Sequence, residues 1–198
     1  MRVGSNMELV KNLKTSKIIK YAFIALIGSI ALAISSKIKI PFYPVPMTMQ
    51  TLVVLAIGVI FGWKLGIATI SLYLFEGIIG LPVFAGTPEK GVGLIYFTGP
   101  TMGYLLGFIP AVFFSGFLKV YFKYSLIVRF ILNFALYAFS VSFIYTFGLI
   151  WLLNFVPIEK LWALGALPFL PAEILKISIL AIFTTIFNKD TLSWRSLR

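Results

Sequence analysis

Two charged residues, three positions apart, offer the most distinctive chemistry in this sequence. Glu173 and Lys176 stand in the segment Pro-Ala-Glu-Ile-Leu-Lys, inside the last long apolar stretch of the chain. Residues three apart share a helix face, so the two side chains are expected to meet. Charges at membrane depth are costly unless paired or hydrated, and they often mark binding sites. We favour a ligand site with donors and an acid; a structural ion pair or a lysine that reaches the outer interface stays open.

Other polar and aromatic residues are weaker candidates for a site. Glu76, near the end of another apolar stretch, could face the same cavity or only form a hydrogen bond at the membrane interface. Gln50 and Tyr73 are compatible with ligand contact, although buried amides and hydroxyls in membranes more often join helices. Phe84 and Tyr96 could cap an apolar ligand or anchor the chain at the interface.

The residue types that are absent exclude several kinds of chemistry. The chain has no cysteine and no histidine. Disulfides, thiolate nucleophiles and histidine metal sites are therefore excluded. No phosphate-binding loop with its lysine is present either. We expect no catalytic residue, no metal site and no cofactor bound by this chain, and an enzyme is not the favoured interpretation.

The elements that must position these residues are membrane-spanning helices. Of the 198 residues, 60% are hydrophobic and only 12% are charged, against roughly a quarter charged in soluble domains. Apolar runs of about 20 residues alternate with short basic segments, which is the pattern of repeated membrane crossings. We predict an all-α membrane protein: one domain over 1–198, folded as a compact bundle of six transmembrane helices. The predicted spans are 18–36, 47–63, 65–81, 99–121, 126–153 and 169–187.

The loops between the predicted spans differ in character. Residues 37–46 contain three prolines and cannot be helical, so they are expected to be extended or turned. The stretch 83–98 is too rich in Gly and Pro to span a membrane, yet it is unusually apolar for water. Such a segment is typically re-entrant or folds over a cavity.

The basic residues predict the orientation of the chain. With the N-terminus in the cytoplasm, only Lys37, Lys39, Lys90 and Lys160 of the seventeen lysines and arginines face outward, and Lys176 lies inside a span. The positive-inside rule therefore places both termini in the cytoplasm. Residues 1–16 are a cytoplasmic segment without a cleavable signal peptide, and residues 1–6 look like a vector-derived extension before a native start at Met7. The net charge of +11 is better explained by anionic lipid than by nucleic acid.

Two series of glycines with a spacing of four predict close contacts between helices. They are Gly58, Gly62 and Gly66, and Gly99, Gly103 and Gly107. Small residues in line on one helix face let a neighbouring helix approach. Packing within the chain is favoured over a contact between copies.

Four motifs, in this order, resemble the BioY family of biotin-specific S-components of energy-coupling factor (ECF) transporters. They are 44–52 (PVPMTMQTL), 80–86 (GLPVFAG), 99–104 (GPTMGY) and 169–176 (FLPAEILK). The resemblance covers nearly the whole chain from Lys17 onward. It implies a protein of a prokaryotic cell membrane that captures biotin on the outer face. Import then needs a transmembrane coupling protein (the T component) and a pair of cytoplasmic ATPases, which use ATP.

The resemblance also implies roles for individual residues. An acid and a lysine of the last helix contact the ligand, which places Glu173 and Lys176 in the site. The third loop closes over the ligand, which assigns that role to the stretch from Phe84 to Gly86. Family members dock the coupling protein through an Ala-x-x-x-Ala face on the first helix. The nearest equivalents here are Ala25, Ser29 and Ala33.

Two departures and three alternatives qualify this expectation. The family usually has Gly-Asp where this chain has Ala172-Glu173, and Ser29 interrupts the alanine face. The physics of the sequence alone is also compatible with an S-component for another vitamin. An intramembrane enzyme would need Glu173 and Glu76 in one cavity. A purely structural scaffold would tolerate loss of Lys176.

Overall fold

The computed structural model describes residues 3–118 and 124–187, with the backbone alone for residues 3–16. Part of the predicted orientation rests on side chains outside this range. These are Arg2, Lys11, Lys14, Lys119, Lys123, Lys189, Arg195 and Arg198. The assignment of residues 1–6 to a vector falls on the same undescribed side chains.

The described chain is almost entirely helical. The helices are α1 (Val3–Lys37), α2 (Gln50–Ile78), α3 (Leu94–Phe97), α4 (Met102–Phe117), α5 (Leu126–Leu152), α6 (Ile158–Gly165) and α7 (Leu170–Ile186). The predicted proline-rich loop contains a short antiparallel hairpin, in which β1 (Lys39–Ile40) pairs with β2 (Met47–Thr48). The expectation of extended or turned geometry there is confirmed.

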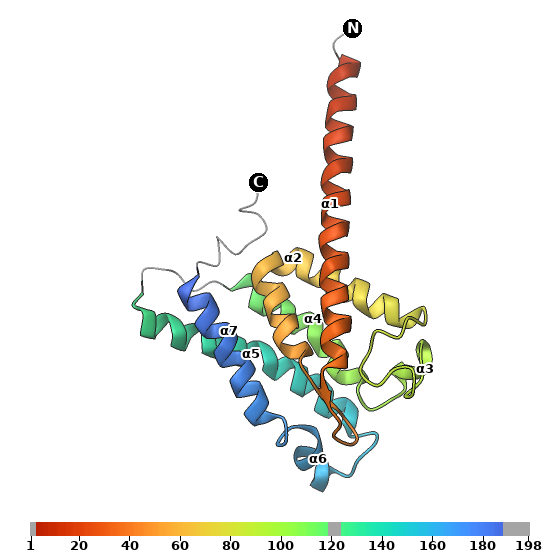
Figure 1. Ribbon diagram of the computed structural model, residues 1–198, viewed down its shortest axis with the longest axis vertical. Coiled ribbons are helices and arrows are strands. Elements are labelled where there is room, and N and C mark those ends of the chain that lie inside the picture. The colour runs from red at the N-terminus through yellow and green to blue at the C-terminus, as the bar shows by residue number, and fades with distance from the viewer. Residues whose placement is uncertain (1–2, 119–123, 188–198) are drawn as a thin grey trace.

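The helices pack in the order α1, α2, α4, α5, α7, each mainly against the next. The far end of α1 projects beyond the rest of the molecule (Figure 1). The first residues of α1 and the last of α7 lie toward the top of this view, while the hairpin and α6 lie at the bottom. Large apolar side chains remain exposed along α1, α5 and α7, as expected for helices that face lipid.

The predicted second and third spans are two arms of α2. The prediction placed their boundary at Lys64 and Gly66, but the break lies at Gly62, whose φ of 75° and ψ of 166° are not helical. Glycine adopts a positive φ without the steric cost of a Cβ. The chain therefore changes direction inside one helical element, near the top of Figure 1.

Three helices among the described residues are long and apolar enough to cross a membrane: Lys17–Lys37 of α1, α2 and α5. Helices α6 and α7, bent by 43° at a short break, would form a fourth span. Helix α4, with 16 residues, is shorter than the predicted span 99–121. Helix α6 lies in a connection for which no helix was predicted; it follows Pro157, and Glu159 stands in its first turn. The count of six spans stays a prediction.

Glycines bring α4 close to both of its neighbours. A Cβ on Gly58 would lie 2.0 Å from Ser115 Oγ on α4, and one on Gly107 would lie 2.6 Å from Ile144 Cα on α5. Gly103 and Gly66 make similarly close contacts within the chain. The expectation of intramolecular packing is confirmed at these four positions.

Candidate functional site

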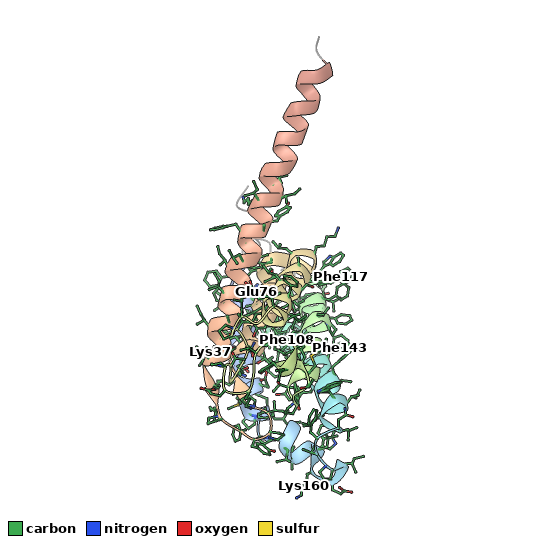
Figure 2. The ribbon with its side chains drawn as sticks, turned by 90° about the vertical axis from the view of Figure 1, so that its right-hand side faces the viewer. Lys37, Glu76, Phe108, Phe117, Phe143 and Lys160 are labelled. Carbon is green, nitrogen blue, oxygen red and sulfur yellow. The ribbon has the colours of Figure 1, made fainter. Side chains whose placement is uncertain are left out.

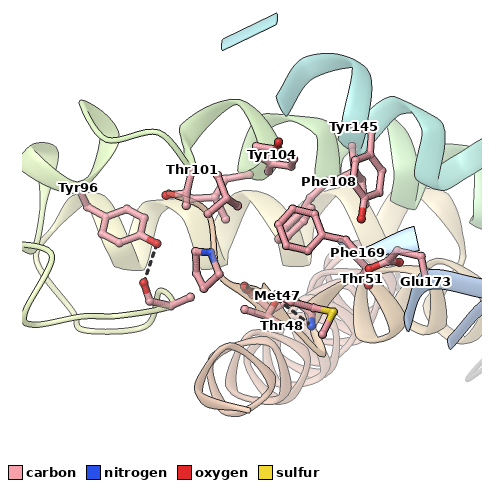
Figure 3. Close-up of a pocket in the computed structure, with 16 residues that line it drawn as sticks. Met47, Thr48, Thr51, Tyr96, Thr101, Tyr104, Phe108, Tyr145, Phe169 and Glu173 are labelled. Carbon is pink, nitrogen blue, oxygen red and sulfur yellow. Dashed lines mark hydrogen bonds between the residues drawn. The ribbon is translucent and has the colours of Figure 1, made fainter. Parts of the chain in front are cut away.

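A small cavity lies where the hairpin, α2, the 83–98 loop, α4, α5 and α7 converge. Its volume is about 60 Å³. Figure 3 shows Tyr145 and Phe169 beside Glu173 and Thr51 at one end, and Tyr96 at the other. The wall consists of Val45, Pro46, Met47, Thr48, Gln50, Thr51, Ala85, Tyr96, Thr101, Tyr104, Leu105, Phe108, Ile144, Tyr145, Phe169 and Glu173. Apolar and aromatic walls with a few polar groups are typical of small-molecule sites.

Glu173 and Lys176 form the predicted pair, and both are buried. Lys176 Nζ lies 2.8 Å from Glu173 Oε1. It also donates to the carbonyl oxygen of Thr48 at 2.6 Å and to Thr51 Oγ1 at 3.1 Å. An ammonium group has three hydrogens, so three acceptors satisfy it. Lys176 is only 3% exposed, which excludes a lysine that reaches the interface.

The acid faces the cavity, whereas the lysine lies behind it. Glu173 lines the wall and Lys176 does not. Thr51 Oγ1 donates to Glu173 Oε1 at 3.0 Å, which leaves Glu173 Oε2 as a buried oxygen without a hydrogen-bond partner. Buried polar atoms nearly always have a partner, and an exception calls for an explanation such as a ligand or water. Glu173 Oε2 is the free acceptor of this cavity.

The aromatic residues of the wall are fixed by their own contacts. Tyr104 donates to the carbonyl oxygen of Gly165 at 2.8 Å, and Tyr96 donates to that of Ala85 at 2.8 Å. Phe169 packs against Tyr145 with ring centroids 6.5 Å apart. The prediction included Tyr96 but missed Tyr104, Tyr145 and Phe169. Tyr104 and Phe169 stand at the ends of two of the four motifs, so a signal was present. Tyr145 had none beyond its type.

The other predicted site residues divide into wall and support. Gln50 and Tyr96 line the cavity, as predicted. Phe84 is buried one layer behind, with its ring 4.8 Å from that of Tyr96. Tyr73 is fully buried in that same layer. Gly86 has a φ of 81° and permits the turn after Ala85, the member of this loop that reaches the wall.

Glu76 lies apart from the cavity. Its Oε1 accepts a hydrogen bond from Ser29 Oγ at 2.8 Å, between α2 and α1. Ala25 and Ser29 are buried and Ala33 is half-buried. Contact of these three residues with a coupling protein stays a prediction.

An apolar groove of about 590 Å³ lies between α5, α6 and α7 and shares Tyr145 and Glu173 with the cavity. Exposed Ile150, Trp162 and Ile174 form part of it. The wall that carries Glu173 is therefore thin and separates the cavity from a surface suited to lipid.

The BioY family model matches residues 7–191. The chain belongs to the BioY family. A probable biotin transporter BioY of Pyrococcus horikoshii is 31% identical over 159 residues, which cover 80% of this chain and 90% of the relative. The biotin transporter BioY2 of Lactococcus lactis is 32% identical over 173 residues, 86% and 91% of the two chains. Because the members are transporters, this BioY chain is not an enzyme.

A solved structure agrees with the fold of this BioY chain. The crystal structure of the S-component for biotin from an ECF-type ABC transporter superposes with a TM-score of 0.65 at 26% identity. It covers 88% of this chain and 92% of its own. The fold expected from the four motifs is therefore shared with that S-component.

Proposed function

We propose that this chain is the S-component of an ECF-type importer and binds biotin in the cavity beside Glu173. Membership of the BioY family and the likeness to a biotin S-component support the proposal. The observation that carries it is the buried Glu173 Oε2, which has no hydrogen-bond partner and belongs to the cavity wall.

The donors and acceptors of the site suit the ureido ring of biotin. A carboxylate only accepts hydrogen bonds, and the ureido N–H groups only donate them. Glu173 would accept from this ring, and Phe108, Tyr145 and Phe169 would pack against the fused rings. Lys176 already donates to three acceptors. Its role in the proposal is to hold Glu173 in place.

The proposal extends to direction and partners. The hairpin and the 83–98 loop beside the cavity carry Lys37, Lys39 and Lys90, the residues assigned to the outer side by the positive-inside rule. The site would therefore open outward from a prokaryotic cell membrane. Import would require a transmembrane coupling protein and a pair of cytoplasmic ATPases.

The structural alternative to this proposal is weakened by geometry. An acid–base pair made of Glu173 and Glu76 would need both carboxylates in one cavity, but Glu76 bonds Ser29 and is absent from the wall. A vitamin other than biotin and a pure scaffold are distinguished by ligand binding.

The test is equilibrium binding of biotin to the purified chain in detergent, with a panel of other vitamins. We expect selective one-to-one binding of biotin. In Glu173→Gln, an amide replaces the carboxylate at nearly the same volume, and affinity should fall about a hundredfold through loss of a charged acceptor. In Lys176→Met, a similar loss is expected because the buried carboxylate is left without its cation.

A matched control is Glu76→Gln, which makes the same change at a carboxylate outside the cavity. Its affinity for biotin should equal that of the wild type. A well-folded wild-type chain that ignores biotin would refute the proposal, and tight binding of a different vitamin would replace the substrate. Binding that survives both Glu173→Gln and Lys176→Met would move the site elsewhere.

A further inference from the structure

A second layer of polar side chains lies directly behind the cavity and joins it to the outer loop. Gln50 belongs to the cavity wall, and its Nε2 donates to the hydroxyl oxygen of Tyr73 at 2.7 Å. The Tyr73 hydroxyl in turn donates to the carbonyl oxygen of Val83 at 3.0 Å. Tyr73 itself is fully buried and is absent from the wall. It connects two regions without touching the space between them.

The inner end of this layer reaches the charged pair. Thr48 Oγ1 donates to Gln50 Oε1 at 3.3 Å, and the carbonyl oxygen of the same Thr48 accepts from Lys176. Figure 3 shows Thr48 beside Thr51 and Glu173 at this end of the cavity. The hydrogen bonds form one series from Lys176 through Thr48, Gln50 and Tyr73 to the loop. Such networks strengthen one another in a medium of low dielectric.

The outer end of the layer holds the loop segment 83–87 against the helices. Ser36 Oγ also donates to the carbonyl oxygen of Val83, at 2.8 Å, and Lys37 Nζ donates to that of Phe84 at 3.0 Å. The ring of Phe84 packs edge-on against Tyr73, with centroids 5.2 Å apart. Tyr73 is thus the one anchor of this segment, among the contacts named here, that also contacts a residue of the cavity wall.

We propose that Tyr73 is a positioning residue that couples biotin in the cavity to closure of the 83–87 segment. The inference rests on the proposed function, because it takes biotin as the ligand. Biotin beside Gln50 fixes the amide, the amide fixes the Tyr73 hydroxyl, and that hydroxyl holds Val83 and with it Ala85 over the site. Tyr73 makes no contact with the ligand.

The test is Tyr73→Phe, which removes the hydroxyl and keeps the ring that packs on Phe84. Dissociation of biotin should become about tenfold faster, since two hydrogen bonds of the closed arrangement are lost. Hydrogen exchange of the 83–87 amides gives a second readout. In the wild type, saturating biotin should slow this exchange; in Tyr73→Phe, most of that slowing should disappear.

Two control variants separate coupling from simple anchoring. Ser36→Ala removes the other donor to the Val83 carbonyl, but the bonds printed for Ser36 do not reach Gln50. Exchange in the segment should rise with and without biotin, and biotin should still slow it as much as in the wild type. Tyr137→Phe makes the same change at a buried tyrosine bonded to Thr184, and should leave both readouts unchanged.

The outcomes separate this inference from the proposed function. Failure of the wild type to bind biotin would overturn the proposed function. Normal binding by the wild type, with wild-type release and protection in Tyr73→Phe, would overturn the coupling alone. Equal loss of biotin-dependent protection in Ser36→Ala and Tyr73→Phe would also overturn it, because Tyr73 would then be one anchor among several.

Discussion

At the scale of single residues, Thr51 determines how the charged pair is used. Its hydroxyl donates to Glu173 and accepts from Lys176. A hydroxyl has one hydrogen, so Thr51 has none left for a ligand. Both charged groups are instead held in one orientation, with Glu173 Oε2 turned to the cavity. Thr51 therefore contributes to recognition by positioning and not by direct donation.

Thr51→Val should weaken biotin binding about tenfold. The substitution keeps the shape of the side chain but leaves Glu173 and Lys176 each short of one partner, and an unmet buried hydrogen bond costs about 1–3 kcal/mol. Equilibrium binding in detergent measures the effect. Thr51→Ser keeps the hydroxyl and should bind like the wild type. Equal affinities for the valine and serine variants would contradict this role.

The sequence predicted part of the site at this scale because some contacts are local. Glu173 and Lys176 are three apart on one helix, so their meeting followed from helix geometry. Thr51 and Tyr145 join them from helices more than a hundred and about thirty residues away, and no local pattern specifies such contacts. Tyr73 was predicted as a ligand contact because its type suited one, but only the packing shows it behind the wall.

At the scale of elements, close glycine contacts set the spacing of α4 and α5. These helices contribute Tyr104, Phe108 and Tyr145 to the wall. Gly107 faces the backbone of α5 at Ile144, where no flexible side chain can move aside. The separation of the aromatic walls therefore depends on the absence of a side chain at this position.

Gly107→Ala should lower the stability of the folded chain by about 1–3 kcal/mol, the usual cost of an overpacked core. The added Cβ would lie 2.6 Å from Ile144 Cα, so the two helices must separate. Thermal unfolding in detergent, followed by fluorescence, measures the loss. Ser142→Ala, at an exposed position of α5, is the matched small change and should unfold like the wild type. An unchanged melting temperature in Gly107→Ala would show that the helices adjust freely.

Helix positions were largely predictable at this scale, and helix boundaries were not. Long apolar runs identified the regions of α1, α2, α4, α5 and α7. The break in α2 was predicted at Lys64 and Gly66, since a charge and a glycine are common signals of an interruption. It lies at Gly62 because that residue adopts the positive φ. In a series of three glycines, the sequence offers no means of choosing which one does so.

At the scale of the whole molecule, the charges and the fold point to the same division into two ends. Figure 2 shows Lys37 and Lys160 toward the end opposite Phe117. The hairpin and α6 lie at the end of Lys160, and the break in α2 lies at the other. The positive-inside rule assigns the first end to the outside.

The natural absence of cysteine makes this sidedness directly testable. Single cysteines replacing Glu89, Lys160 or Lys64 occupy exposed positions. In intact cells, a membrane-impermeant maleimide should label the Glu89→Cys and Lys160→Cys variants. The Lys64→Cys variant should react only after the membrane is opened, and the cysteine-free parent should not react at all. Labelling of Lys64→Cys alone in intact cells would reverse the orientation.

The cavity of about 60 Å³ has a consequence for the kinetics of uptake. Sites for small molecules usually measure about 300–1,000 Å³, so this conformation must expand before a vitamin enters. The measured dissociation constant then equals the intrinsic one divided by the fraction of molecules that are open. The observed rate of association should level off at high biotin concentration, at a value set by the protein alone. A bacterium that carries this chain would gain long retention of a scarce nutrient at the expense of rapid capture.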